Sequence, residues 1–157
     1  MSAFALCFIN HYLCGIRACA HTREVKEQLN SDKMKRVIAT PDAPKAVGPY
    51  SQAIEVNGTL YISGQIPVNP ADGMVQEDIV AAAHQSLKNI GAILKEAGMT
   101  YDNVVKTTVL LADIADFKAV NEVYAGYFTG DKPARACYQA AALPLGVKVE
   151  IEAIAVK

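Results

Sequence analysis

Apolar residues recur along this chain with two different periods, which predict both helices and strands. Over residues 78–97 they follow each other at steps of three and four, as on one face of a helix, and Gly98 ends the pattern. A shorter stretch, residues 116–128, repeats this spacing and stops at Gly130. Its apolar side carries Phe117, Val120, Tyr124 and Tyr127.

Other segments are rich in β-branched residues or alternate between apolar and polar, which predicts strands. The pair Asn57-Gly58 stands between two of them and is a strong signal for a hairpin turn. Residues 143–146 form a short connection between the last two segments, so we expect these two strands to pair antiparallel. The predicted strands are 36–39, 51–56, 59–63, 103–112, 134–142 and 147–156.

The order of these elements predicts an α+β fold. Helices occur only among the middle strands, which favours a single mixed β-sheet with two helices packed on one face. The last strand is apolar on both faces, as Val149, Ile151 and Ile154 illustrate. We therefore expect oligomerisation to cover the open face of the sheet. The alternative is a sheet face that meets water and carries scattered apolar residues.

The first 33 residues differ from the rest of the chain. No acidic residue occurs before Glu24, whereas two arginines do. Three interpretations stay open: a mitochondrial presequence, a secretory signal with an A-x-A-like cleavage site, and a poorly ordered extension with Met34 as the natural beginning of the domain. The sequence thus predicts an extension over residues 1–33 and one domain over 34–157, located in the cytoplasm or, with a presequence, in the mitochondrion.

Composition excludes several classes of protein. The chain of 157 residues has 15 Lys and Arg against 16 Asp and Glu, a formal charge of −1, which argues against binding of nucleic acid by bulk electrostatics. No apolar run is long enough to span a membrane. Beyond residue 33 the only cysteine is Cys137 and the only histidine is His84, and phosphate-binding glycine motifs are absent. We therefore expect neither a metal nor a cofactor.

Arg135 opens a strand whose other residues are mostly small and apolar. A guanidinium in this setting loses hydration unless it meets an anion. Two interpretations stay open: an arginine that reaches solvent or pairs with an acid, and a fork that binds a carboxylate or phosphate through two parallel hydrogen bonds. By strand alternation Cys137 shares the face of Arg135, and an inert buried thiol is the common state of such a cysteine.

Two acidic residues interrupt the last strand. Glu150 and Glu152 lie two positions apart and so share one face. They are either a device that keeps an edge strand soluble or an acid/base group that positions water. If this strand paired with residues 134–142, Arg135 would lie within a strand or two of the face that carries these acids.

Five segments together resemble the Rid family, also called the YjgF family, and within it the reactive intermediate deaminase A group. The resemblance covers residues 35–157, with all five motifs in order. The segments are AVGPYSQAI (46–54), YISGQIPVNP (61–70), VVKTTVLLADIADFKAVNEVY (104–124), PARACYQAAALP (133–144) and VEIEAIAV (149–156).

The resemblance implies a fold, an assembly and a reaction. Members have a chorismate-mutase-like α+β fold and form homotrimers with sites in clefts between subunits. They hydrolyse reactive enamine and imine intermediates, of the 2-aminoacrylate/2-iminopropanoate and 2-iminobutanoate type, to 2-oxo acids and ammonia without a metal or cofactor. Small 2-imino acids and further copies of this chain are therefore the expected partners.

The resemblance also implies roles for individual residues. Arg135 matches the arginine that binds the substrate carboxylate, and Glu150 matches the glutamate associated with the hydrolytic water. Similar sequences lack the cysteine, so no nucleophilic role is expected for its thiol. The residues that match the substrate-binding positions are Tyr50, Ser63, Gly64, Gln65, Asn121 and Cys137.

Two other functions compete with deamination. One is an RNA-acting translation inhibitor with endoribonuclease activity, because some relatives have been described in this way. The acidic domain and the lack of a histidine pair for acid/base cleavage disfavour it. The other is a non-catalytic trimer that binds metabolites in the same clefts.

Overall fold

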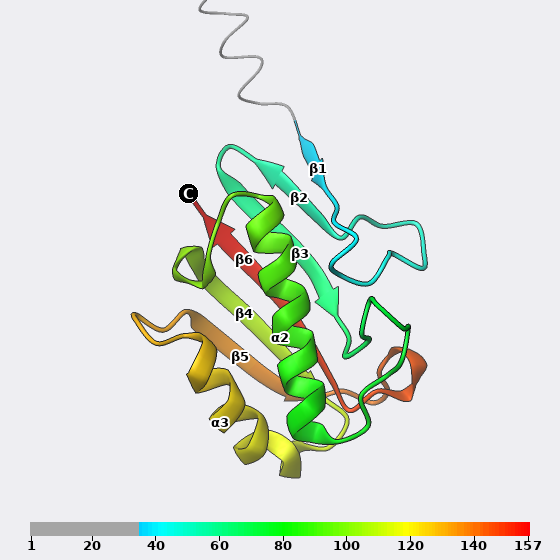
Figure 1. The fold of residues 1–157 in the computed structure, drawn as a ribbon. Helices are drawn as coiled ribbons and strands as arrows, with labels where there is room; N and C mark the ends of the chain where they lie inside the picture. Colours follow the sequence, from blue (N-terminus) through cyan, green and yellow to red (C-terminus); the bar gives the residue numbers. More distant parts are fainter. Residues whose placement is uncertain (1–34) are drawn as a thin grey trace, which may run out of the picture. The chain divides into compact units, whose positions relative to one another are not determined.

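The computed structural model describes residues 35–157, which form six strands and two α-helices (Figure 1). The predicted extension over residues 1–33 lies outside the described residues. The strands are β1 (Arg36–Ile38), β2 (Ala53–Val56), β3 (Thr59–Gln65), β4 (Val104–Leu111), β5 (Ala134–Gln139) and β6 (Val149–Val156). The helices are α2 (Ile79–Glu96) and α3 (Phe117–Tyr127).

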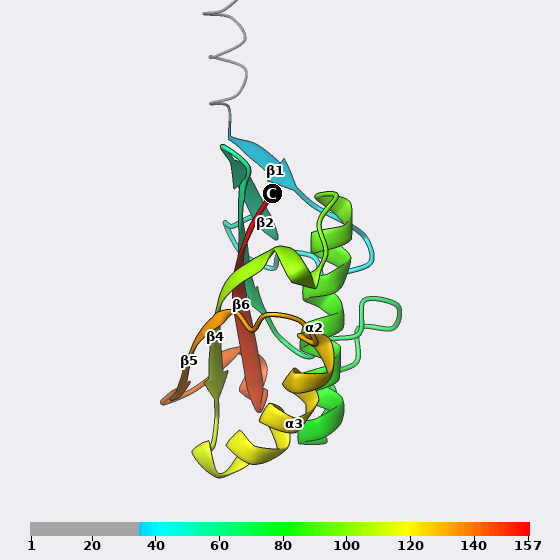
Figure 2. The ribbon, with the colours of Figure 1, turned by 90° about the vertical axis from the view of Figure 1, so that its left-hand side faces the viewer.

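The six strands form one mixed sheet in the order β1-β2-β3-β6-β4-β5. Only β4 and β5 run parallel, and every other neighbouring pair is antiparallel. Both helices lie on the same side of the sheet, and no helix of the described chain covers the other side (Figure 2). The predicted α+β fold, with one mixed sheet and two helices on one face, is therefore confirmed.

The predicted antiparallel pairing of residues 134–142 with 147–156 is wrong. Strand β4 lies between β5 and β6 and pairs with both. β4 is rich in β-branched residues and suits a central position, whereas β5 has exposed residues at both ends and suits an edge. The connection between β5 and β6 is longer than a hairpin turn and contains the 3-10 helix Pro144–Gly146, which lets it pass the end of β4.

The hairpin predicted at Asn57-Gly58 joins β2 to β3. Both residues have positive φ, 52° for Asn57 and 73° for Gly58. This is the backbone of a type I′ turn, whose twist matches that of the flanking strands. The local sequence therefore fixes the register in which Val56 faces Thr59.

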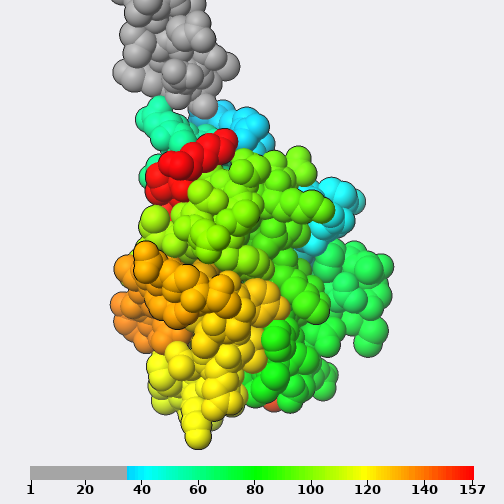
Figure 3. Space-filling view, turned by 60° about the vertical axis from the view of Figure 1, so that its left-hand side comes forward, coloured from blue at the N-terminus to red at the C-terminus, as the bar shows by residue number. Residues whose placement is uncertain are grey.

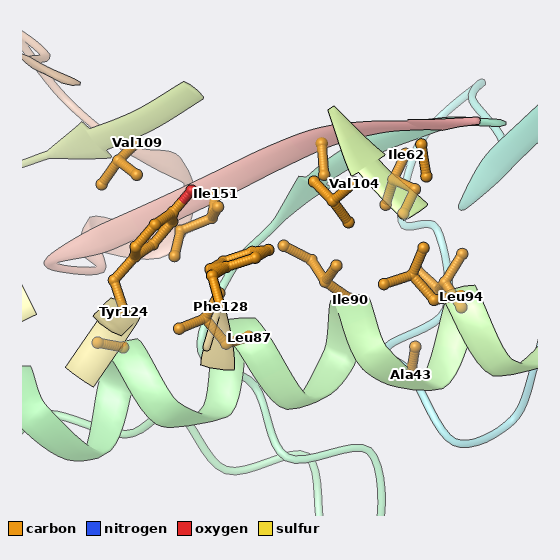
Figure 4. Close-up of a cluster of buried hydrophobic side chains, with 14 of the residues drawn as sticks. Ala43, Ile62, Leu87, Ile90, Leu94, Val104, Val109, Tyr124, Phe128 and Ile151 are labelled. Carbon is orange, nitrogen blue, oxygen red and sulfur yellow. The ribbon is translucent and has the colours of Figure 1, made fainter. Parts of the chain in front are cut away.

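The predicted helix over residues 78–97 is present as α2. Asp78 caps its first turn, since the carboxylate Oδ1 accepts a hydrogen bond from the backbone N–H of Ala81 at 2.9 Å. Beyond its end, Gly98 takes a positive φ of 70°. The apolar stripe of α2 packs on the sheet, so the period of three and four marks the buried face (Figure 4).

The hydrophobic core lies between α2, α3 and one face of the sheet. In Figure 4, Leu87 and Ile90 of α2 lie opposite Ile151 and Val104 of the sheet. Full burial of one such aliphatic side chain contributes about 1.5–3 kcal/mol. Because alternate residues of β6 face this core, Glu150 and Glu152 face the uncovered side.

One carboxylate ties both ends of the described chain to the sheet. Glu55 on β2 accepts a hydrogen bond from Nε of Arg36 on β1 at 2.9 Å, and it also pairs with Lys157. The hydrogen bond from Lys157 is the largest effect on the pKa of Glu55, and together with Arg36 it holds this pKa below the ordinary value of 4.5. The ionised carboxylate therefore stabilises the fold above about pH 4.5, and this contribution is lost as the pH falls through the folded-state pKa.

We expect Glu55→Gln to lower the melting temperature at pH 7, because two cations lose their charged partner. The free energy of unfolding should fall by about 1 kcal/mol. The difference from wild type should shrink as the pH falls below about 4.5. Thermal melts across pH 3 to 7 measure this effect. Glu122→Gln, on the exposed side of α3, is the control and should change little. A deficit that stays constant with pH would contradict the role of the ionised carboxylate.

Candidate active site

Arg135 stands at the beginning of edge strand β5, beside helix α3. Its Nη2 donates a hydrogen bond to Oδ1 of Asn121 at 2.8 Å. Its Cζ lies 4.6 Å from the ring centre of Tyr124 and 5.5 Å from that of Phe117. Figure 3 shows the surface on which α3 and β5 adjoin. Positions 117, 121 and 124 lie on one face of the helix, so α3 holds the guanidinium along a single stripe.

No carboxylate neutralises Arg135 within the described part of the chain. Among residues 35–157, salt bridges occur only at Glu55. An amide oxygen and two aromatic faces orient the guanidinium but leave its net charge in place. This arrangement removes the interpretation in which Arg135 pairs with an acid of its own domain, and it favours binding of an anion from outside.

Cys137 follows Arg135 on the same face of β5 and packs against the core. Burial raises the pKa of its thiol above the ordinary value, and the opposing effect of Arg135 is smaller. The thiol therefore stays protonated at neutral pH, which agrees with an inert cysteine and not with an activated nucleophile.

Glu150 lies on the uncovered face of the sheet, against Gly64 of β3. A Cβ added to Gly64 would lie 1.9 Å from Oε1 of Glu150 and 2.8 Å from its Cδ. Only glycine therefore leaves room for the carboxyl group where it stands. Burial raises the pKa of Glu150, and the negative charge of Glu152 raises it further. A half-buried carboxyl group with a raised pKa binds a proton more readily than a free one, which suits it to accept and release a proton.

The other predicted residues of β3 have structural hydrogen bonds. The hydroxyl of Ser63 donates to the backbone oxygen of Ser51 at 2.7 Å. The amide of Gln65 is buried and donates to the backbone oxygen of Ser63 at 2.9 Å. These contacts shape the strand where its register with β6 shifts, between Ile62 and Gln65.

Tyr50 adjoins this group across a pocket. Its side chain is 51% exposed, and its hydroxyl accepts a hydrogen bond from the N–H of Val47 at 3.5 Å. The pocket has a volume of about 340 Å³, and its lining includes Tyr50, Gly64, Gln65 and Leu145. The structure therefore brings Tyr50, Gly64 and Gln65 together, with Glu150 in contact with Gly64.

The two groups of predicted residues lie on opposite faces of the sheet. Arg135 pairs in register with Thr107 of β4, and Glu150 pairs with Leu110 of the same strand. Positions 107 and 110 are an odd number of residues apart, so their side chains point to opposite sides. Arg135 is two strands from Glu150, as expected, but one chain does not present both to the same ligand.

Sequence reasoning missed two residues around Arg135. The sequence pattern places Tyr124 on the apolar side of its helix, and it gives Thr107 no feature beyond that of a β-branched residue in a strand. In the structure the hydroxyl groups of the two are 2.7 Å apart, and the Tyr124 ring lies under the guanidinium. The available signal was the spacing of Phe117, Asn121 and Tyr124, which places them on one helix face.

Residues 35–157 contain no group of three or more His, Cys, Asp or Glu side chains arranged to hold a metal ion. Neither of their helices is both long and apolar enough to cross a membrane.

Comparison with known proteins identifies the family. The sequence model of the family described as Endoribonuclease L-PSP matches residues 40–157. The chain belongs to this family, the Rid or YjgF family. The predicted resemblance is therefore confirmed over nearly the whole described domain.

Relatives of known name share more than half of the aligned residues with this chain. The mouse protein called 2-iminobutanoate/2-iminopropanoate deaminase is 58% identical over 128 residues, which covers 81% of this chain and 95% of the mouse protein. The human protein of the same name is 56% identical over 128 residues, covering 81% and 93%. The chloroplastic Reactive Intermediate Deaminase A of Arabidopsis thaliana is 52% identical over 126 residues, covering 80% of this chain and 67% of the plant protein.

Solved structures of this family have the same fold. The YjgF gene product of E. coli has a TM-score of 0.76 and 47% identity, covering 78% of this chain and 98% of the bacterial chain. The structure of E. coli TdcF with bound serine has a TM-score of 0.76 and 42% identity, covering 78% and 98%.

We expect Gly64→Ala to displace the Glu150 carboxyl group, because the new Cβ would overlap Oε1. A displaced carboxyl group regains water, so its pKa should fall toward the ordinary value of 4.5. NMR titration of the glutamate side-chain carboxyl carbons, with Glu150→Gln to assign the signal, measures the change.

Gly126→Ala is the matched control, since an added Cβ at Gly126 meets nothing within 4 Å. It should leave the titration of Glu150 unaltered. If Gly64→Ala also leaves it unaltered, the contact between Gly64 and Glu150 does not set the environment of the carboxyl group.

Proposed function

We propose that this chain hydrolyses reactive enamine and imine intermediates of small amino acids, such as 2-iminopropanoate and 2-iminobutanoate, to 2-oxo acids and ammonia. The observation that carries the proposal is Arg135, a guanidinium oriented by neutral contacts and left without a carboxylate partner in the described domain. Each of these substrates has one carboxylate that such a fork can bind. The names of the mouse and human relatives support the same reaction, and bound serine in TdcF is a small ligand with a carboxylate.

The proposed chemistry needs only orientation and proton transfer. Arg135 binds the substrate carboxylate and holds the imine carbon in place. Glu150 accepts a proton from water as the water oxygen bonds to the carbon of the protonated imine, which gives a neutral tetrahedral carbinolamine. Glu150 then gives this proton to the nitrogen. As the carbon–nitrogen bond breaks, the carboxylate of Glu150 takes the remaining hydroxyl proton, the carbonyl forms, and that proton leaves with ammonia as ammonium. No covalent enzyme intermediate occurs, so a protonated Cys137 presents no obstacle.

The proposed site is built from two copies of the chain. Arg135 and Glu150 point to opposite faces of one sheet, so one substrate meets both only when the α3–β5 edge of one subunit approaches the uncovered face of another. That face carries apolar side chains such as Tyr61 and Val156, which are 48% and 40% exposed in the single chain. A homotrimer with three such clefts accounts for both features.

Mixed trimers test whether each site uses two chains. Arg135→Ala and Glu150→Gln subunits are both inactive alone under this proposal. If they are mixed at random, a site is intact when its arginine comes from one variant and its glutamate from the other, so roughly a quarter of wild-type turnover should return. Co-expression with two different tags and a coupled dehydratase assay measures this. No recovery in mixed trimers that are verified by mass would assign both residues to the same chain or to no common site.

Arg135→Lys tests the two-pronged grip. Lysine keeps the charge but lacks the planar pair of donors, so kcat/KM should fall roughly 10- to 100-fold, and further in Arg135→Ala. A displaced substrate should lower kcat as well as raise KM. Steady-state turnover of 2-iminobutanoate and thermal melts measure both effects.

Arg36→Lys is the control, because Arg36 is the other arginine of the described residues and pairs with Glu55. It should keep wild-type kinetics. Wild-type kinetics in folded Arg135→Lys and Arg135→Ala would reduce Arg135 to a solubilising charge and remove the proposed site.

Ribonuclease activity is a second candidate because the family description names it. Within residues 35–157 the only imidazole is His84, and its Nδ1 is 3.0 Å from the hydroxyl of Tyr127. This part of the chain has 11 basic and 13 acidic residues, so it also lacks an electrostatic footprint for RNA. Deaminase and RNA-cleavage assays on one metal-free preparation separate the two functions. A Glu150→Gln variant that binds 2-oxo acids without turnover excludes the non-catalytic metabolite binder.

A further inference from the structure

We propose that Tyr124, anchored by Thr107, is a positioning residue that fixes the plane of the Arg135 guanidinium for carboxylate binding; the inference rests on the proposed function of Arg135. The Tyr124 ring centre lies 4.6 Å from Cζ of Arg135, the shorter of its two aromatic contacts. An aromatic face attracts a guanidinium stacked on it. It uses none of the N–H donors at the edge of the guanidinium, so these stay free to bind a carboxylate.

Thr107 fixes the height and tilt of this ring. Its hydroxyl oxygen is 2.7 Å from that of Tyr124, and its side chain is completely buried. It is also the residue of β4 that pairs in register with Arg135 on β5. The pairing of β4 with β5 therefore determines the positions of both Arg135 and Thr107, which anchors the Tyr124 ring.

The Tyr124 ring also packs against Phe128 (Figure 4). Their ring centres are 4.4 Å apart, and Tyr101 meets Phe128 edge to face at 5.6 Å. Tyr124 is 5% exposed. Burial raises the pKa of its hydroxyl group, so the hydroxyl keeps its proton and its bond to Thr107 throughout the physiological range. The support under Arg135 is thus continuous with the core.

This support matters because a free arginine side chain has many rotamers. Fixing such a side chain in one geometry costs conformational entropy. Tyr124 and Asn121 restrict the guanidinium already in the folded chain, with the amide oxygen at one edge and the ring against its face. A substrate carboxylate then binds a fork that is already oriented.

The test compares two variants that remove an aromatic ring from the same cluster. Tyr124→Leu removes the face under Arg135, whereas Phe128→Leu removes the neighbouring ring, which does not contact the guanidinium. Tyr124→Leu should raise KM for 2-iminobutanoate and Kd for 2-oxobutanoate roughly 5- to 30-fold. Phe128→Leu should lower the melting temperature but keep KM within about twofold. Equal KM values in the two folded variants would make Tyr124 an ordinary core residue.

Two conservative variants measure the contribution of the anchor. Tyr124→Phe keeps the ring and Thr107→Val keeps the shape, but both break the bond between the hydroxyl groups. Each should raise KM by less than Tyr124→Leu does, roughly 2- to 5-fold. If Tyr124→Leu does not fold, these two variants carry the test, and wild-type KM in both would overturn the inference.

A second measurement does not depend on turnover. The chain has four arginines, so its Nε–H signals are few, and Arg135→Lys assigns the relevant one. The order parameter of the Arg135 Nε–H should be high in wild type and Phe128→Leu, and low in Tyr124→Leu. Equal order in all three overturns the positioning role. The three proteins could also show the expected order parameters while wild type neither binds 2-oxobutanoate nor turns over imine. The proposed function then fails, and the positioning of the guanidinium stands.

Discussion

Within residues 35–157 the helices cover only one face of the sheet, and the arrangement of the candidate site follows from this constraint. Alternate residues of β4 and β6 must be apolar toward α2 and α3, because that side forms the core. The remaining positions are free to carry Glu150, Glu152 and Thr108 on the uncovered side. One chain therefore offers an acid on one face and, at the edge beyond β4, a cation on the other.

The positions of the two charged groups differ in how they are stabilised. The carboxyl group of Glu150 fits against β3 because Gly64 has no Cβ, so its environment depends on the glycine at this position. The guanidinium of Arg135 is held by three side chains of α3, so its environment depends on direct contacts with them. The pKa of Glu150 is raised, and the guanidinium charge is preserved by neutral contacts. Within the described part of the chain, neither the guanidinium of Arg135 nor the carboxyl group of Glu150 has a partner of opposite charge.

Much of the fold could be predicted from local sequence. The hairpin at Asn57-Gly58 and the stripe of α2 are local signals, and both are present in the structure. The position of β4 between β5 and β6 depends on how three strands are buried together, which is not a local signal. The short segment between β5 and β6 therefore predicted the wrong neighbour for each of them. Arg135 and Glu150 stood out as charges on apolar strands. Tyr124 did not, because a tyrosine on the apolar side of a helix has the same pattern whether it supports the core or a guanidinium.

The ion pairs of Glu55 with Arg36 and Lys157, here called the Glu55 clamp, have a consequence for the topology of the domain. Arg36 belongs to the first strand of the described chain and Lys157 is its last residue, yet both bind one carboxylate. The two ends of the described residues therefore lie close together, and a short linker between them would close residues 35–157 into a ring. New ends can then be opened at the exposed turn around Asp72 and Gly73, which lies far from the clamp in sequence. In such a circular permutant every strand keeps its neighbours, and only the order in which they are synthesised changes.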